Sequence, residues 1–293
     1  MPLEIEGPSR IFLKLECLQP IGSFKIRGSG NALALADEAE LARGVWTASA
    51  GNMAQGVAWN ARRLGIPCTV VVPESAPRAK RDALERLGAR IVPIPFERWW
   101  QVFTDRSYPG MEGIFVHPFA NPAVIAGNGT IGLEILEDLT EVDAVLVPYG
   151  GGGLVCGIAS AVKALSPRTR VFGCEVETAA PLAASLAAGR PSAVNYTPSF
   201  VDGIGGRGLL PEMWPMVKAL LAGSLVVSLD EIAAAIRLLV SRARVVAEGA
   251  GAASVAAALS AQAPSGTVVC VVSGGNVDAN VLAAILSGVP PSR

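Results

Sequence analysis

The chain is poor in the side chains that most metal sites and hydrolytic triads require. It has one histidine, His117, among its 293 residues, and its five cysteines lie far apart, without the paired spacing of a zinc ligand set. Zinc sites built from several His or Cys side chains, and triads that need a histidine base, are therefore excluded, and no metal site is predicted. The cysteines are expected to be reduced packing residues of a cytoplasmic protein.

Long apolar runs and basic clusters are also missing. Hydrophobic residues make up 51 % of the chain, but Gly, Pro or charged residues interrupt every run before the ~18 residues that a membrane span needs. The N-terminal residues 1–6 are acidic and lack a signal-peptide pattern. The net charge is -1 and no basic run occurs. We therefore expect neither a membrane nor a nucleic acid as partner.

Short strand-like and helix-like segments alternate along most of the chain. In the first half, apolar strands are expected at 45–48, 68–72, 90–94 and 114–116, with helices at 53–64 and 76–87 between them. The second half repeats this alternation, with strands at 144–147, 171–175, 225–227 and 268–272. The pattern predicts an α/β fold of two open, twisted parallel-sheet lobes. The smaller lobe, residues 43–118, is inserted in the larger one, residues 1–42 and 119–293.

One of the few lysines has unusual surroundings. The chain contains only Lys14, Lys25, Lys80, Lys163 and Lys218. Lys25 lies between Phe24 and Ile26, just after a Pro-Ile-Gly turn. Apolar surroundings lower the pKa of a lysine, and the neutral amine can then condense with a carbonyl group. Lys25 is thus a candidate nucleophile, although a lysine at the start of a helix is more often only a surface residue.

Four consecutive glycines, Gly150 to Gly153, separate a buried strand from the helix expected at 154–165. Such a turn lets successive backbone N–H groups point at one anion, and the helix N-terminus adds partial positive charge, so the pattern predicts a phosphate site. A dinucleotide site is the rival interpretation, because Gly151 and Gly153 begin that fingerprint and Glu175 ends a strand further on. Two observations disfavour a dinucleotide site. Cys156 occupies the position of the third glycine, and the glycines lie in the middle of the chain instead of after the first strand.

Two further strand ends carry small polar residues. Ser273 ends the last buried strand, where a hydroxyl would point into the ligand crevice of an open α/β sheet. Ser49 ends the strand at 45–48, and Asn52 is the expected N-cap of the helix at 53–64. The free N–H groups of such a helix start suit a carboxylate.

These motifs together resemble one known family. SFKIRG at 23–28, SAGNMAQG at 49–56, GGGGL at 150–154 and SGGN at 273–276 occur in the order and at the separations of the fold-type II pyridoxal phosphate (PLP) enzymes. The branch that they resemble is the serine/threonine dehydratase (threonine deaminase) family, which also contains serine racemases. Residues 117–134, 201–204 and 248–253 resemble segments of the same branch. The resemblance implies a fold like that of the tryptophan synthase β chain.

The resemblance also implies a role for each matching position. Lys25 would form the Schiff base with the cofactor, pyridoxal 5'-phosphate, and would later remove the Cα proton of the substrate. The residues that would bind the cofactor are Phe24, Lys25, Asn52, Gly150, Gly151, Gly152, Gly153, Leu154 and Ser273. Those that would hold the substrate carboxylate are Ser49, Gly51, Asn52 and Met53, with Met53 in the place of the usual histidine.

The implied reaction is β-elimination from L-serine, L-threonine or a related 3-hydroxy amino acid, which yields a 2-oxo acid and ammonia. A neutral Ser273 at the ring nitrogen makes the ring a weaker electron sink than an aspartate would, which favours expulsion of the β-hydroxyl over storage of the charge. The implied enzyme is a lyase of amino-acid metabolism, working as a homodimer or homotetramer.

Alternatives remain at this point. An amino-acid (serine) racemase or a β-replacement enzyme would use the same cofactor, and a non-catalytic paralogue would only bind an amino acid. Racemases of this branch carry a serine where this chain has Ala50, which favours the dehydratase. Members with a divalent cation place an acid a few residues beyond Glu175, where this chain has Ala179, Ala180 and Pro181. Glu175 alone stays a possible metal ligand.

Overall fold

The structure of the protein, a computed structural model, describes residues 1–7 and 9–289. The chain forms two compact units. Unit 1 comprises residues 1–23 and 129–293, and unit 2 comprises residues 24–128, so unit 2 interrupts the sequence of unit 1. Helix α6 (Pro122–Asp138) contains the point at which the chain returns from unit 2 to unit 1.

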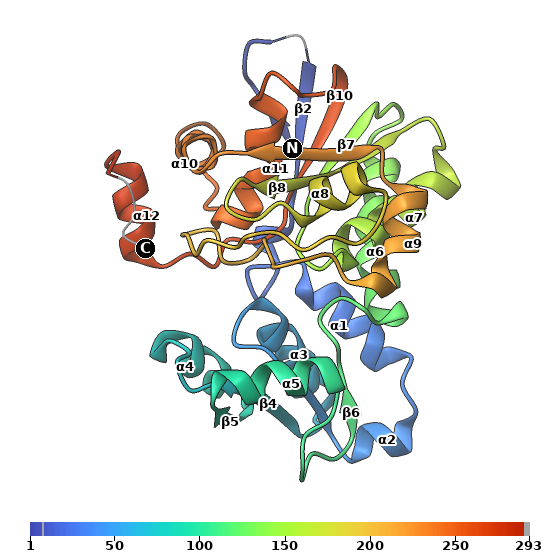
Figure 1. Ribbon diagram of the computed structural model, residues 1–293, viewed down its shortest axis with the longest axis vertical. Coiled ribbons are helices and arrows are strands. Elements are labelled where there is room, and N and C mark those ends of the chain that lie inside the picture. Colours follow the sequence, from blue (N-terminus) through green and yellow to red (C-terminus); the bar gives the residue numbers. More distant parts are fainter. Residues whose placement is uncertain (8, 290–293) are drawn as a thin grey trace. The chain divides into compact units, whose positions relative to one another are not determined.

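Unit 1 is built on a six-stranded sheet of order β1-β2-β10-β7-β8-β9. The strands are β1 (Pro2–Leu3), β2 (Ser9–Leu15), β7 (Ala144–Pro148), β8 (Arg170–Val176), β9 (Gly223–Val227) and β10 (Gly266–Val272). Only the pairing of β1 with β2 is antiparallel. Figure 1 shows β2 and β10 side by side, although Val268 and Ile11, which pair in register, lie far apart in the sequence. The open parallel sheet predicted for the larger lobe is confirmed.

Helices cover this sheet because its strands are apolar on both faces. Strand β7 is buried along its whole length, as expected for a parallel sheet between helical layers. Helix α11 (Gly249–Leu259), rich in alanine and glycine, packs along β10 and β7 with nearly all its residues buried. The other helices of unit 1 are α7 (Gly153–Leu165), α8 (Pro181–Ala188), α9 (Trp214–Leu220), α10 (Leu229–Leu238), the π-helical η3 (Leu239–Ala243) and α12 (Ala279–Leu286).

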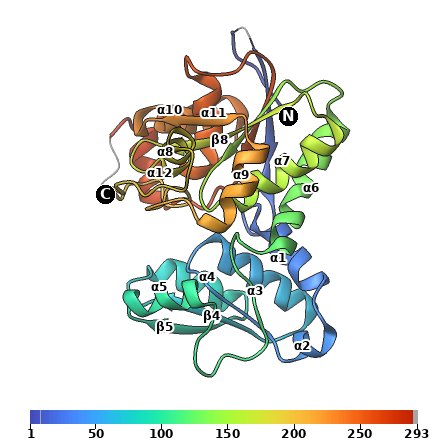
Figure 2. The same cartoon turned by 45° about the vertical axis from the view of Figure 1, so that its right-hand side comes forward.

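Unit 2 contains a four-stranded parallel sheet of order β5-β4-β3-β6. Its strands are β3 (Val45–Ala48), β4 (Cys68–Pro73), β5 (Arg90–Ile94) and β6 (Ile114–Phe115). Both faces are covered, because Val70 and Val72 contribute to one apolar cluster and Val71 to another. The helices, shown in Figure 2, are α1 (Lys25–Ala34), α2 (Glu38–Ala42), α3 (Asn52–Leu64), α4 (Arg78–Arg86) and α5 (Phe96–Asp105).

The structure corrects some sequence-based expectations. Gly51, not Asn52, is the N-cap of α3, and Asn52 is the first helical residue. The glycine provides the non-helical cap conformation without a side-chain hydrogen bond, which leaves the Asn52 side chain outside the capping role. Helices α2, α5, α8, α9 and α12 were not predicted. No helix in the described parts of the chain is long and apolar enough to cross a bilayer.

The two glycines that precede β6 give a test of local packing. Gly110 and Gly113 both have positive φ, 78° and 76°. A Cβ at Gly110 would meet nothing, whereas a Cβ at Gly113 would overlap the carbonyl oxygen of Gly44. We expect Gly110→Ala to lower the free energy of unfolding by about 1 kcal/mol, the cost of a left-handed backbone. Gly113→Ala should cost at least about 3 kcal/mol, because backbone must move.

The comparison is made by urea unfolding followed by far-ultraviolet circular dichroism. Equal losses of stability in the two variants would show that the contact between Gly113 and Gly44 does not constrain the entry into β6.

Candidate active site

Lys25 is the first residue of helix α1, and its side chain is half buried. Its Nζ donates a hydrogen bond to the carbonyl oxygen of Pro118 at 3.1 Å and lies 4.9 Å from the centroid of the Phe24 ring. The amine therefore has an aromatic face and a backbone carbonyl as neighbours.

The carbonyl group of Pro118 lies in a turn that His117 stabilises. His117 Nδ1 accepts the backbone N–H of Ala120 at 3.0 Å, so the ring proton is on Nε2. Burial lowers the pKa of His117 to about 4, and the charges of Arg106 and Lys25 act in the same direction. The imidazole is thus neutral at neutral pH and serves as an acceptor that shapes the 117–120 turn. Sequence reasoning gave Pro118 no role, because a carbonyl oxygen has no sequence signature.

The residues predicted to bind the substrate carboxylate lie at the neighbouring strand end of unit 2. Strand β3 is parallel to β6, with Val45 opposite Ile114, so the two strands end at the same edge of the sheet. Beyond β3, Ser49 Oγ accepts the N–H of Gly51 at 3.2 Å, which forms a tight turn into α3. The N-terminal turn of α3 has no capping side chain. Its backbone N–H groups suit an anion such as a carboxylate.

The glycine turn of unit 1 leads from β7 into α7. Gly152 is the N-cap of α7, with φ 88° in the left-handed region, and no side chain caps this helix. The helix begins with the hydrogen bond from the N–H of Cys156 to the carbonyl oxygen of Gly152. Because glycine leaves no side chain over the turn, backbone N–H groups at the start of a thirteen-residue helix form the donor set. This arrangement is chemically suited to a phosphate.

Ser273 follows β10 and is 3 % exposed. Strand β10 is parallel to β7, with Val268 opposite Ala144 and Cys270 opposite Leu146. The two strands therefore end at the same edge of the sheet, and Ser273 and the glycine turn, Gly150 to Gly153, leave from adjacent strand ends. The structure brings these two predicted cofactor contacts together within unit 1.

The strand end that carries Ser273 also holds the segment that leads to Lys25. Ser23 forms an antiparallel bridge with Gly274, and the N–H of Gly275 donates to the carbonyl oxygen of Gly22 at 2.9 Å. Asn276 Nδ2 donates to the carbonyl oxygen of Ile21 at 2.8 Å. Phe24 and Lys25 follow directly in the chain.

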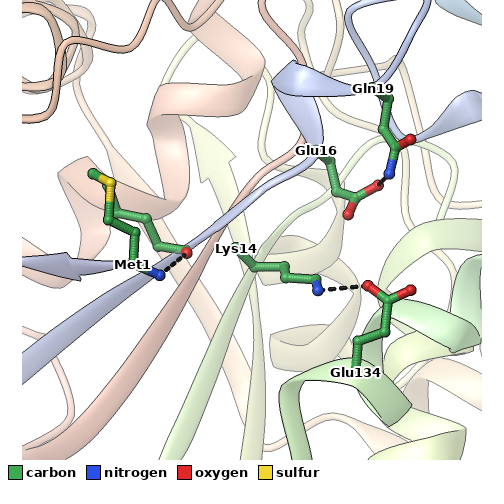
Figure 3. Close-up of polar contacts among 6 residues, drawn as sticks. Met1, Lys14, Glu16, Gln19 and Glu134 are labelled. Carbon is green, nitrogen blue, oxygen red and sulfur yellow. Dashed lines mark hydrogen bonds and ion pairs between the residues drawn. The ribbon is translucent and has the colours of Figure 1, made fainter. Parts of the chain in front are cut away.

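Contacts earlier in the chain hold strand β2 and the residues between it and Ser23. Lys14 on β2 forms an ion pair with Glu134 on α6, and Gln19 Nε2 donates to Glu16 at 3.2 Å (Figure 3). Glu16 is 1 % exposed. The chain between β2 and Ser23 is therefore held by polar contacts before it enters unit 2.

Glu175, considered above as a metal ligand, has a structural role. Its carboxylate accepts the N–H groups of Leu182 and Ala183 at 2.7 and 2.8 Å, and the hydroxyl of Ser224 at 2.7 Å. It thereby supplies the first turn of α8 with acceptors. Burial raises the pKa of Glu175, and the three hydrogen bonds oppose that shift. Within residues 1–7 and 9–289, no group of three or more His, Cys, Asp or Glu could hold a metal ion.

Comparisons with known proteins give the family. The model of the family described as "Pyridoxal-phosphate dependent enzyme" matches residues 3–274. An L-threonine ammonia-lyase of Thermotoga maritima is 44 % identical over 288 residues, which are 97 % of this chain and 71 % of that protein. The solved structure of maize serine racemase superposes with a TM-score of 0.88 at 34 % identity, over 96 % of this chain and 87 % of that one. The processed form of threonine deaminase isoform 2 from Solanum lycopersicum gives a TM-score of 0.86 at 32 % identity, over 96 % and 79 %.

The donor set of unit 1 fits the cofactor of such proteins, because the turn offers backbone N–H groups for a phosphate and Ser273 offers a neutral hydroxyl beside it. The predicted fold class and the predicted PLP-dependent ammonia-lyase type are confirmed by these relatives. The match of the family model over residues 3–274 and these identities show that the chain belongs to the pyridoxal-phosphate-dependent enzyme family.

Proposed function

We propose that this enzyme eliminates water from L-threonine, L-serine or a related 3-hydroxy amino acid, and that water then hydrolyses the released enamine to a 2-oxo acid and ammonia. The observation that carries the proposal is the placement of Ser273, a neutral hydroxyl, at the strand end next to the glycine turn of unit 1. The Thermotoga maritima relative, an L-threonine ammonia-lyase, supports threonine as a substrate. When bound, PLP withdraws electrons from the Cα of an attached amino acid and so weakens its bonds.

In this proposal, Lys25 has two tasks. Its Nζ would hold the cofactor covalently, and the same atom would accept the Cα proton of the substrate. The second task requires a neutral amine. The hydrogen bond to the carbonyl oxygen of Pro118 limits the rotation of Nζ. The proton that Nζ takes from Cα balances the proton that the β-hydroxyl needs in order to leave as water.

The remaining residues bind and orient. The N–H groups of the turn from Gly150 to Leu154 would hold the phosphate, and the hydroxyl of Ser273 would be the partner of the ring nitrogen, without a negative charge there. Phe24 would pack near the ring, and Asn52 would donate a hydrogen bond to the ring's 3'-oxygen. The start of α3, with Ser49, Gly51, Asn52 and Met53, holds the substrate carboxylate. A fixed carboxylate orients the Cα–H bond toward the base, and such orientation is a major part of the rate gain.

Racemisation of serine is the second candidate, because maize serine racemase shares the fold over most of both chains. A racemase needs a proton donor on the face of Cα opposite the lysine. The position after Ser49 is Ala50, whose methyl group donates no proton. Elimination is therefore favoured over racemisation here.

Several wider expectations remain predictions. We propose a cytoplasmic location and a homodimer or homotetramer, with a small hydroxy amino acid as partner and neither nucleic acid nor membrane. The five cysteines are all buried and free, which supports a reducing compartment.

Replacement of the lysine tests the proposal directly. Lys25→Ala should lose the visible absorbance band of the bound cofactor and at least about 10³-fold in ammonia release, because both the attachment point and the base disappear. Lys163→Ala is the matched control, since Lys163 lies on α7 and donates to the carbonyl oxygen of Ala219 on the surface. Retention of the band and of ammonia release in Lys25→Ala would refute the role of Lys25.

The glycine turn is tested by adding one methyl group. Gly152→Ala places a Cβ on a residue with φ 88°, 3.3 Å from Met213 Cε, and should weaken PLP binding about tenfold through the strained backbone. Gly189→Ala is the control, because Gly189 also has positive φ, 65°, in unit 1 but a Cβ there would meet nothing. The dissociation constants are measured by titrating the apo forms with PLP. Equal affinities in the two variants would contradict a phosphate site at this turn.

A substitution at Ala50 distinguishes elimination from racemisation. The wild type should convert L-threonine or L-serine to 2-oxo acid and ammonia in equal amounts, with almost no D-isomer. Ala50→Ser adds a hydroxyl that can carry a proton and should raise the ratio of D-amino acid to 2-oxo acid about tenfold. Chiral chromatography and an ammonia assay measure both products. Abundant D-serine from the wild type would assign the chain to the racemases.

A further inference from the structure

The first turn of α1 lacks the features that usually stabilise a helix N-terminus. Its N-cap, Phe24, makes no side-chain capping hydrogen bond, and the turn contains no acidic residue. It does contain Lys25 and Arg27, whose positive charges are unfavourable at this end of a helix. Helix ends without caps tend to fray. Lys25, the proposed base, therefore lies in a helix turn that other contacts must hold in place.

Two polar side chains hold this turn through its carbonyl groups, one from α1 and one from α3. Ser29 is fully buried, and its Oγ donates to the carbonyl oxygen of Lys25 at 2.7 Å. Asn60 Nδ2 lies 3.0 Å from the carbonyl oxygen of Ile26, 2.9 Å from Ser29 Oγ and 3.0 Å from the carbonyl oxygen of Gly56. The carbonyl groups of the first two residues of α1 are thus both tied into one network, which we name the Ser29–Asn60 clamp.

The clamp joins α1 and α3, two helices that pack against each other (Figure 2). A Cβ on Gly56 of α3 would lie 2.8 Å from the carbonyl oxygen of Lys25 and 2.9 Å from Ser29 Oγ, so only glycine permits this approach. Helix α3 begins at Asn52, one turn before Gly56. The clamp therefore holds the backbone of Lys25 against the helix whose start is proposed to bind the substrate carboxylate.

The other flank of α1 packs closely against α6. A Cβ on Gly28 would lie 2.8 Å from the carbonyl oxygen of Val124, and a Cβ on Gly127 would lie 2.6 Å from that of Arg27. Asn31 Nδ2 donates to the carbonyl oxygen of Ala123 at 2.7 Å. This flank orders the middle of the helix, whereas the Ser29–Asn60 clamp reaches the carbonyl groups of its first two residues.

We propose that Ser29 and Asn60 are positioning residues that fix the backbone of Lys25 relative to α3 and thereby set the direction of its Nζ. The inference rests on the proposed role of Lys25 as the base and deepens it. Loss of the clamp lets the first turn of α1 open, and Nζ then spends less time aligned with the Cα–H bond. The expected effect falls on kcat, because neither residue is placed against the substrate.

The experiment compares the wild type with Asn60→Ala, Ser29→Ala and the double variant. Asp37→Ala is the matched control, because Asp37 also supports the start of a helix in unit 2, where its carboxylate accepts the N–H groups of Ala39 and Glu40 in α2. Three quantities are measured: kcat and KM for ammonia release, the fraction of Lys25 that carries cofactor after borohydride reduction, and hydrogen exchange of the peptide that spans 25–34.

Asn60→Ala should lower kcat about tenfold with KM changed less than about twofold, and should speed exchange in 25–34. Ser29→Ala should act in the same direction more weakly, and the double variant should lose less than the product of the single losses, because the two residues share one network. Asp37→Ala should leave kcat and exchange in 25–34 unchanged. If Asn60→Ala does not fold, Ser29→Ala alone carries the test.

Two results overturn the inference in distinguishable ways. Unchanged kcat and unchanged exchange in 25–34 for Asn60→Ala and Ser29→Ala, in a wild type that carries cofactor on Lys25, would refute the clamp alone. A wild type without cofactor on Lys25 would refute the proposed function, on which the clamp's role in catalysis rests.

Discussion

The pairing of β10 with both β2 and β7 is the constraint on which the arrangement of unit 1 depends. It joins Gly266–Val272 to the first strand of the parallel set and to the strand that precedes the glycine turn. The parallel register with β7 brings Ser273 and the turn to one edge of the sheet. The continuation of β10 then binds Gly22 and Ser23, the last residues before Phe24 and Lys25. A single buried strand thus organises three stretches that are distant in the sequence.

The site uses backbone groups where many enzymes use charged side chains. The donors proposed for the phosphate and for the substrate carboxylate are the N–H groups at the starts of α7 and α3, and neither helix has a side-chain cap. The acceptor for Lys25 is a carbonyl oxygen, and the only histidine is a neutral acceptor that shapes the same turn. The use of backbone groups in place of charged side chains is consistent with a composition of 17 % charged residues. Selectivity for anions then comes from geometry and helix dipoles.

Much of this could be predicted from the sequence, because glycine turns and strand ends have strong local signatures. The alternation of short apolar runs predicted both parallel sheets, and four consecutive glycines between a strand and a helix predicted the turn at Gly152 that leads into α7. The binding of an anion at this turn stays a prediction. The N-cap of α3 was assigned to Asn52 because asparagine is a good capping residue, but Gly51 takes that place and Asn52 is helical. Helix α5 was not predicted, although Phe96, Trp99 and Trp100 recur at helical spacing. The contacts of Asn60 and Pro118 depend on tertiary packing and have no counterpart in local sequence.

The position of β10 also affects how the polypeptide is completed during synthesis. Residues 24–128 contain all four strands of their own sheet, so this unit can close while the ribosome is still translating the rest. The other sheet cannot, because its strand β10, which lies between β2 and β7, is translated after all the other strands of the sheet. Until then the apolar edges of β2 and β7 have no partner between them. Nascent chains that stall before residue 266 would therefore expose unpaired strand edges, which favour aggregation.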